Sequence, residues 1–231
     1  MSDPLENPVR SALTGPQRSL ADHRGRAARY RPDIAPFCAL PLDPEPADWA
    51  DLAALVGPGG EAVLAGPARP APAGWTTVMD LPGVQMTGDG LVAEPDPEAV
   101  RLGPADVPEM LDLVARTRPG PFKQRTIELG TYLGIRREGA LVAMAGERMR
   151  VPGRTEISAV CTDPAVRGQG LAARLMRAVA VGIRERGDEP FLHAAASNTG
   201  AIRLYEHLGF TLSRELVFVG LTRVSAGQSA A

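Results

Sequence analysis

The sequence has little cysteine and little histidine. Cys38 and Cys161 are the two cysteines among 231 residues. Both lie inside apolar, strand-like runs, so we expect buried free thiols and neither a disulfide nor a nucleophile. The three histidines are His23, His193 and His207. Only one of them falls in the N-terminal half, which gives a zinc site little support there, and we expect no metal.

The sequence also lacks a strong net charge and a long apolar run. A formal net charge of −2 gives no electrostatic footprint for nucleic acid or for an anionic membrane surface. The first residues contain no apolar segment of signal-peptide length, and no run approaches the ~20 residues of a membrane span. We therefore expect a cytoplasmic protein with neither nucleic acid nor membrane among its partners.

The most informative segment spans residues 157–175, ISAVCTDPAVRGQGLAARL. A strand-like run ends near Pro164, a glycine loop follows, and a helix opens directly after it. Apolar residues then recur at one-turn spacing, as in an amphipathic helix, at Leu171, Leu175, Val179 and Ile183. Gly168 and Gly170 stand where a capping side chain would satisfy the first backbone N–H groups, so these donors are free to face an anion such as a pyrophosphate.

Taken alone, this loop is compatible to the same degree with a phosphate-binding site and with a plain connection between a strand and a helix. It is too short for the Walker P-loop and has no Gly-Lys-Ser/Thr ending. It also lacks the third glycine of the Gly-x-Gly-x-x-Gly dinucleotide fingerprint.

A second block spans residues 198–210, NTGAIRLYEHLGF, after a predicted strand over residues 190–195. Asn198 is typical of a helix cap and Gly209 of a left-handed stop, which predicts a helix of about three turns.

Together the two blocks resemble the GNAT superfamily of acetyl-CoA-dependent N-acyltransferases. Residues 167–172, RGQGLA, match its Arg/Gln-x-x-Gly-x-Gly/Ala signature, and residues 198–210 match its Asn-x-x-Ala-x-x-x-Tyr-x-x-x-Gly-Phe block. The resemblance covers roughly residues 101–221. It implies an α/β (α+β) fold with a mixed, mostly antiparallel sheet that splays at the cofactor site, with acetyl-CoA as co-substrate. It says little about the acceptor.

The resemblance also implies the residues that contact the cofactor. The pantetheine arm would pair with the free strand edge at Val160 and Thr162, a backbone N–H near Val160 would stabilise the oxyanion, and Asn198 would bind the arm or simply cap its helix. The full set is Val160, Cys161, Thr162, Arg167, Gly168, Gln169, Gly170, Leu171, Ala172 and Asn198.

Glu156 is the first candidate for the base that deprotonates an acceptor amine. Alternation along residues 155–162 puts it on one strand face with Ser158, Val160 and Thr162. The alternative is an exposed strand carboxylate or a charge that binds substrate. Glu147 is the reserve candidate, with substrate recognition as its other reading.

Tyr205 is the candidate acid, because the resemblance places its phenol where it would protonate the departing thiolate. A core tyrosine is the alternative. His193, on the predicted strand, is either a structural histidine or a substrate contact.

The chain divides at residues 88–97, GDGLVAEPDP, which read as a linker that buries little. We expect an N-terminal α/β unit over residues 1–97, a catalytic domain over 98–224 and a mobile tail over 225–231. The N-terminal unit should hold strands near residues 37–40, 62–65, 75–79 and 84–86 around a helix at 49–56. It is either a degenerate copy of the catalytic fold or a family-specific cap.

These observations favour an N-acetyltransferase that moves acetyl from acetyl-CoA to the primary amine of a small-molecule or amino-acid-like acceptor by direct attack. Two alternatives stay open: an acyltransferase that uses a longer or aromatic acyl-CoA with an amino acid, and a non-catalytic acyl-CoA-binding regulatory protein. The sequence predicts no oligomeric state.

Overall fold

The computed structural model describes residues 3–224, and the tail expected over residues 225–231 lies outside that range. The helices are α1 (Pro8–Thr14), α2 (Pro46–Val56), α3 (Val107–Thr117), α4 (Leu171–Glu185) and α5 (Thr199–His207). The strands are β1 (Ala21–Arg24), β2 (Ala27–Tyr30), β3 (Cys38–Ala39), β4 (Glu61–Gly66), β5 (Trp75–Thr87), β6 (Val100–Arg101), β7 (Tyr132–Arg137), β8 (Ala140–Val151), β9 (Arg154–Thr162), β10 (Glu189–Ala195) and β11 (Thr211–Arg223).

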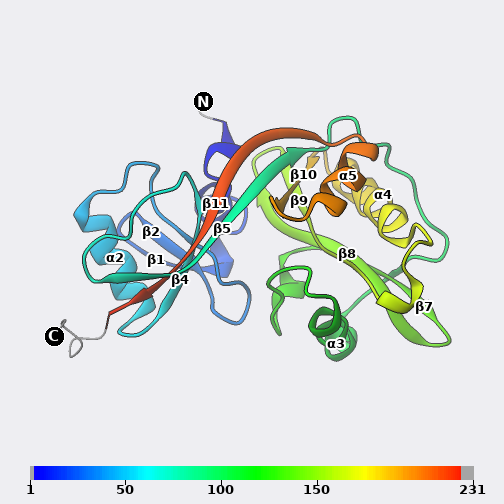
Figure 1. Cartoon of the computed structure of the whole chain (residues 1–231), viewed down its shortest axis with the longest axis horizontal. Coiled ribbons are helices and arrows are strands. Elements are labelled where there is room, and N and C mark those ends of the chain that lie inside the picture. Colours follow the sequence, from blue (N-terminus) through cyan, green and yellow to red (C-terminus); the bar gives the residue numbers. More distant parts are fainter. Residues whose placement is uncertain (1–2, 225–231) are drawn as a thin grey trace.

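An eight-stranded sheet in the order β4-β11-β5-β10-β9-β8-β7-β6 forms the body of the protein (Figure 1), and β1, β2 and β3 form a second, small sheet. Neighbouring strands in both sheets are antiparallel except β9 and β10, which are parallel. The mixed, mostly antiparallel sheet expected from the resemblance is therefore confirmed.

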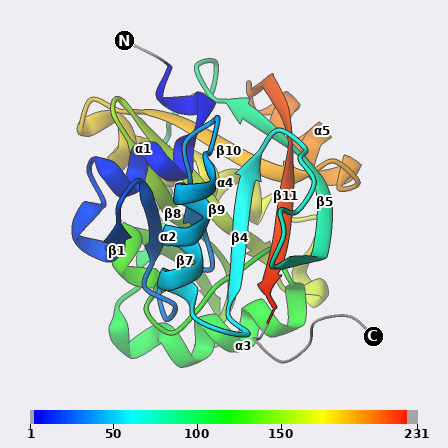
Figure 2. The same cartoon turned by 90° about the vertical axis from the view of Figure 1, so that its left-hand side faces the viewer.

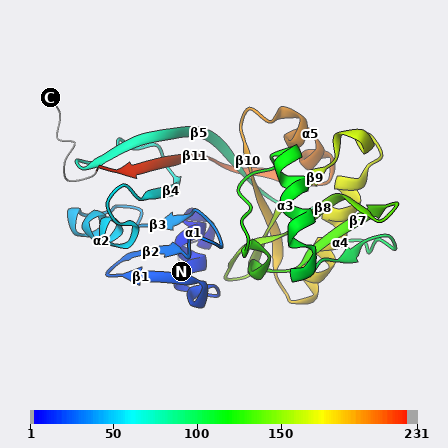
Figure 3. The same ribbon diagram turned by 90° about the horizontal axis from the view of Figure 1, so that it is seen from below.

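Two long strands join the N-terminal and C-terminal parts of the chain. β5 and β11 run side by side along the molecule (Figures 1 and 3). The runs predicted at 75–79 and 84–86 are one continuous strand, β5, which pairs with β10 on one side and β11 on the other. The sheet thus crosses the boundary expected at residues 88–97, because a strand that precedes it is inserted between two strands that follow it.

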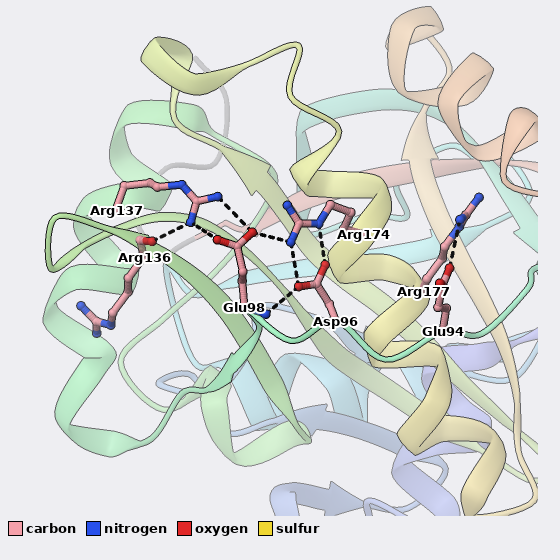
Figure 4. Close-up of polar contacts among 7 residues, drawn as sticks. All are labelled: Glu94, Asp96, Glu98, Arg136, Arg137, Arg174 and Arg177. Carbon is pink, nitrogen blue, oxygen red and sulfur yellow. Dashed lines mark hydrogen bonds and ion pairs between the residues drawn. The ribbon is translucent and has the colours of Figure 1, made fainter.

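Residues 88–97 are mostly exposed, as their composition suggests, but Gly88 and Leu91 are buried. Leu91 is only 1% exposed and anchors the segment in the core under α4. Its acidic side chains pair with arginines of α4, which hold the segment against that helix (Figure 4): Arg174 binds Asp96 at 2.6 and 2.8 Å, and Arg177 contacts Glu94 at 3.4 Å.

Each face of the sheet carries its own core. Because side chains alternate along β8, Ala143 and Ala145 pack in the cluster under α4, whereas Met144 packs in the cluster under α3. At the other end of the molecule, α2 covers the small sheet (Figure 2) and packs through Leu52 in a further cluster with β11.

Both cysteines are free and buried, as predicted. Burial raises the pKa of the Cys38 thiol to about 12 and that of Cys161 to about 11. Both therefore stay protonated at neutral pH, which is unsuited to a nucleophile.

Candidate active site

The sheet opens between β9 and β10. The two strands pair over residues 154–156 and 189–191 and then separate, which leaves the edge of β9 beyond Glu156 free toward β10. This is the splay expected from the resemblance, and it lies directly before the glycine loop.

A bulge in β9 changes which side chains face the opening. Ala159 has φ +52°, and the register of β9 against β8 shifts between Ser158 and Cys161. As a result Ile157 and Val160 both pack in the cluster under α4, which strict alternation forbids. The expected common face of Glu156, Ser158, Val160 and Thr162 is therefore wrong, because the bulge reverses the alternation at residue 159.

The glycine loop leaves its backbone donors free. Gly168 has φ +79° and Gly170 φ +74°, a left-handed conformation that favours glycine. Gly170 occupies the N-cap position of α4 and provides no side-chain cap. Within residues 3–224, the first backbone N–H at this end of α4 that finds a carbonyl is that of Arg174, which donates to Gly170. The preceding N–H groups point outward at the positive end of the helix dipole.

A cavity of about 560 Å³ lies over this loop, and we call it the donor cavity. It also reaches α5, β9 and the end of α3. All ten residues proposed to contact the cofactor line it: Val160, Cys161, Thr162, Arg167, Gly168, Gln169, Gly170, Leu171, Ala172 and Asn198.

A second cavity of about 400 Å³, the acceptor cavity, lies on the other side of the splay. Its wall combines residues from both parts of the chain, including Phe37, Val63 and Leu81 from the N-terminal part and Ser158 and His193 from the C-terminal part. The two cavities share lining residues at their junction, namely Arg118, Pro119, Val160, Asn198 and Tyr205.

Tyr205 is positioned at this junction by α5. Asn198 caps the helix, with its side-chain oxygen accepting the Ala201 N–H at 3.2 Å. The Tyr205 ring packs against Phe210 with 6.1 Å between centroids. Burial raises the pKa of Tyr205 to about 12, so the phenol stays protonated and can act as a donor.

Glu156 lies behind the acceptor cavity rather than in its wall. It is fully buried, and its carboxylate accepts from Arg148 Nη2 at 2.6 Å, from Arg148 Nε at 2.8 Å and from His193 Nδ1 at 2.7 Å. Burial raises the pKa of Glu156, but the Arg148 guanidinium and His193 together outweigh it and lower the pKa to about 2. The second ring nitrogen of His193 lies 3.1 Å from the Gln85 side-chain oxygen, so both nitrogens of His193 have partners.

Glu147 lines neither the donor nor the acceptor cavity. It is 5% exposed, and its carboxylate lies 2.8 Å from Arg186 beyond the end of α4. The structure therefore does not bring Glu147 together with the other predicted site residues.

Two arginines of the site were not predicted from the sequence. Arg118 follows α3 in a left-handed conformation, with φ 49°, and lines both cavities. Arg148 lines the acceptor cavity and lies over the Phe37 ring at 4.9 Å. The available signal was the charged cluster Glu147, Arg148 and Arg150 within the strand-like run 141–151, because a cation buried in a strand needs a partner.

Known proteins with this architecture include a crystal structure of a putative acetyltransferase from the GNAT family of Novosphingobium aromaticivorans DSM 12444. It is 42% identical, with a TM-score of 0.89, over 97% of this chain and 100% of that one. The chain belongs to the GNAT family. It is an acetyltransferase of the GNAT type, and acetyl-CoA is the co-substrate that this family generally uses.

Other similarities are more local. The model for FR47-like protein matches residues 132–219. A mycothiol acetyltransferase of Thermobispora bispora is 46% identical over 57 residues, which cover 24% of this chain and 19% of that protein. The match thus spans about a fifth of the curated relative's length. A GCN5-related N-acetyltransferase from Kribbella flavida shares the fold, with 21% identity and a TM-score of 0.59 over 97% of this chain and 94% of that one. Within residues 3–224, no helix is long and apolar enough to span a membrane.

Proposed function

We propose that this protein transfers the acetyl group of acetyl-CoA to the primary amine of a small-molecule or amino-acid-like acceptor by direct attack. The observation that carries the proposal is the meeting of two cavities at Val160, Asn198 and Tyr205. A thioester entering from the donor side and an amine entering from the acceptor side would meet there, beside the splay.

The donor cavity fits acetyl-CoA. The outward N–H groups after Gly168 suit a pyrophosphate, because they are preorganised donors at a helix N-terminus. The free edge of β9 offers backbone partners to an extended pantetheine arm. Bound there, acetyl-CoA would supply an activated acyl group with a thiolate leaving group.

Tyr205 is our candidate for the proton donor to the departing sulfur. Its phenol stands where both cavities meet, and its raised pKa keeps the proton in place. A group that acts on charge developed only in the transition state contributes to kcat and not to ground-state binding.

Glu156 is better suited to a positioning role than to proton abstraction. Its lowered pKa makes it a weak base, and it reaches the acceptor cavity only through Arg148 and His193. We propose that it orients these two side chains, and that the amine loses its proton to solvent as it enters.

Release of free thiol from acetyl-CoA, measured across a panel of small amines, tests the proposal. We expect thiol release that depends on one class of primary amine, with an N-acetylated product identified by mass spectrometry. Binding of acetyl-CoA without turnover of any amine would favour the non-catalytic alternative. Turnover only with longer acyl-CoA donors would favour the other alternative.

A further inference from the structure

The acceptor cavity has an unusual charge distribution for a site that takes up an amine. Its wall is largely apolar, with Phe37, Val63, Leu81 and Phe218 among its members. Among the described residues that line it, Arg118 and Arg148 are the charged side chains other than the histidine, and no Asp or Glu takes part. A plain ammonium would enter this cavity without any carboxylate to bind it.

Arg148 is held ready for an anion. Its Nε and Nη2 atoms donate to Glu156, and Phe37 supports the guanidinium plane. Within residues 3–224 its Nη1 atom makes no hydrogen bond to the protein. This atom is also not fully buried, so it is accessible to a ligand. The guanidinium thus keeps donor capacity on the side of the cavity while its other side is fixed, which is the geometry of a preorganised carboxylate anchor.

Arg118 supplies a second positive charge at the junction of the cavities. It is exposed, and among residues 3–224 it forms no ion pair with a carboxylate, unlike its neighbour Arg116, which pairs with Asp112 and Asp163. The left-handed backbone of Arg118, with φ 49°, is a strained conformation for a non-glycine residue. Glycine would relieve this strain, so the presence of arginine at this position is consistent with a functional role for its side chain.

Resting on the proposed function, we propose that the acceptor is an α-amino acid with an apolar side chain, whose carboxylate is bound by Arg148 and Arg118. The apolar wall then receives the side chain. The two arginines also favour the neutral form of a nearby amine, since a positive charge disfavours a second one, which aids attack without a carboxylate base in the cavity.

Two triplets of acceptors test the proposal: L-leucine, L-leucinamide and 3-methylbutylamine, and L-phenylalanine, L-phenylalaninamide and 2-phenylethylamine. Within each triplet the carboxylate is kept, neutralised or removed. The amine is less basic in the amide and more basic in the decarboxylated compound than in the amino acid, so basicity alone cannot produce a preference for the amino acid. We expect its kcat/KM to exceed both controls by roughly ten- to a hundred-fold, the range of a charge-assisted hydrogen bond.

Variants locate the effect. Arg148→Lys keeps a cation beside Glu156 but loses the planar guanidinium, which can donate two parallel hydrogen bonds to a carboxylate. Arg118→Gln removes the second positive charge. Both should reduce the preference for the carboxylate. Arg148 lines the acceptor cavity and not the donor cavity, so Arg148→Lys should leave the KM for acetyl-CoA nearly unchanged. Arg101→Gln removes an exposed arginine on β6 that lines neither cavity, and should leave the preference intact. Calorimetric binding of L-leucine to wild type and Arg148→Lys adds a readout that does not depend on turnover.

The outcomes separate the two proposals. Amides or decarboxylated amines used as well as the amino acids would overturn this inference while the proposed transfer stands. Amino-acid binding that depends on Arg148, without any acetylation, would support the anchor and refute the transfer. Neither binding nor turnover of the amino acids would overturn the inference.

Discussion

The guanidinium of Arg148 holds both carboxylate oxygens of Glu156, with Nη2–Oε1 at 2.6 Å and Nε–Oε2 at 2.8 Å. Both side chains are buried, at 8% and 0% exposure. A buried cation is stable only beside an opposite charge. The Glu156 carboxylate therefore allows the Arg148 guanidinium to line the acceptor cavity.

Glu156→Gln should destabilise the fold by about 3–5 kcal/mol, because it leaves the Arg148 charge buried without a counter-charge. Urea denaturation measures the loss. Glu128→Gln is a matched control, since Glu128 makes a bidentate pair with Arg125 at the surface, and should cost less than about 1 kcal/mol. The double variant Arg148→Met with Glu156→Gln should recover much of the loss. Equal effects at Glu156 and Glu128 would contradict the buried pairing.

The same pair predicts a pH dependence of stability. The pKa of Glu156 is about 2 in the folded protein against 4.5 ordinarily. The stabilisation from its ionised form is therefore complete above pH 4.5 and is lost as pH falls toward 2. Denaturation midpoints measured across this window should fall more steeply in wild type than in Glu156→Gln. Parallel curves for the two proteins would show that Glu156 does not titrate there.

Gly170→Glu should abolish binding of acetyl-CoA. The substitution puts a side chain at φ +74° and a negative charge among the N–H groups proposed to face the pyrophosphate. Thermal shift and calorimetry with acetyl-CoA measure the effect, because a ligand that binds the native state raises its melting temperature. Gly139→Glu is the control: Gly139 also has positive φ, +84°, and open space around it, but it lies in the turn between β7 and β8. Unchanged binding by Gly170→Glu would refute the donor site.

Local features of this fold could be predicted from the sequence, and long-range ones could not. The loop at Gly168 and Gly170 and the Asn198 cap have local signatures, and the three helices predicted at 49–56, after Gly170 and after Asn198 are present as α2, α4 and α5. The helix α1 was missed although Asn7 and Pro8 form a typical start, with Asn7 accepting the Arg10 N–H.

The acceptor side depends on contacts that no local pattern encodes. Ala159 carries no sequence sign of its positive φ, so the reversal of faces in β9 could not be foreseen. The insertion of β5 between β10 and β11 joins segments more than a hundred residues apart. The Arg148–Glu156 pair depends on a register that shifts between Glu147 and Arg150.

Tyr205→Phe should lower kcat by about 10²-fold, the low end for a positioned general acid, with the affinity for acetyl-CoA nearly unchanged. The ring still packs against Phe210, so the fold is preserved. The loss should shrink with a thioester whose thiol has a lower pKa and needs less protonation. Tyr132→Phe serves as control, because Tyr132 is another buried tyrosine outside both cavities. Full turnover by Tyr205→Phe, under conditions where chemistry limits the rate, would make the phenol structural.

A fragment that begins at residue 98 should fail to fold cooperatively, because it lacks β5. Residues 191–195 of β10 would lose their partner β5, and β11 would lose both of its partners, β5 and β4. These losses expose unpaired strand edges and the apolar side chains beside them. We expect a low yield of soluble fragment, and urea denaturation of the purified fragment, followed by circular dichroism, should show a broad unfolding transition.

Co-expression of N-terminal segments with this fragment determines whether the loss of β5 causes its failure to fold. Residues 1–97 supply β5 and the segment held by Arg174 and Arg177, so they should rescue the fragment in trans. Residues 1–74, which end before Trp75, should not. The acceptor cavity gives a second readout, because Phe37 and Val63 come from the N-terminal part. A soluble, cooperatively folded 98–224 fragment with an unchanged acceptor range would show that the N-terminal part is dispensable both for the sheet and for acceptor selection.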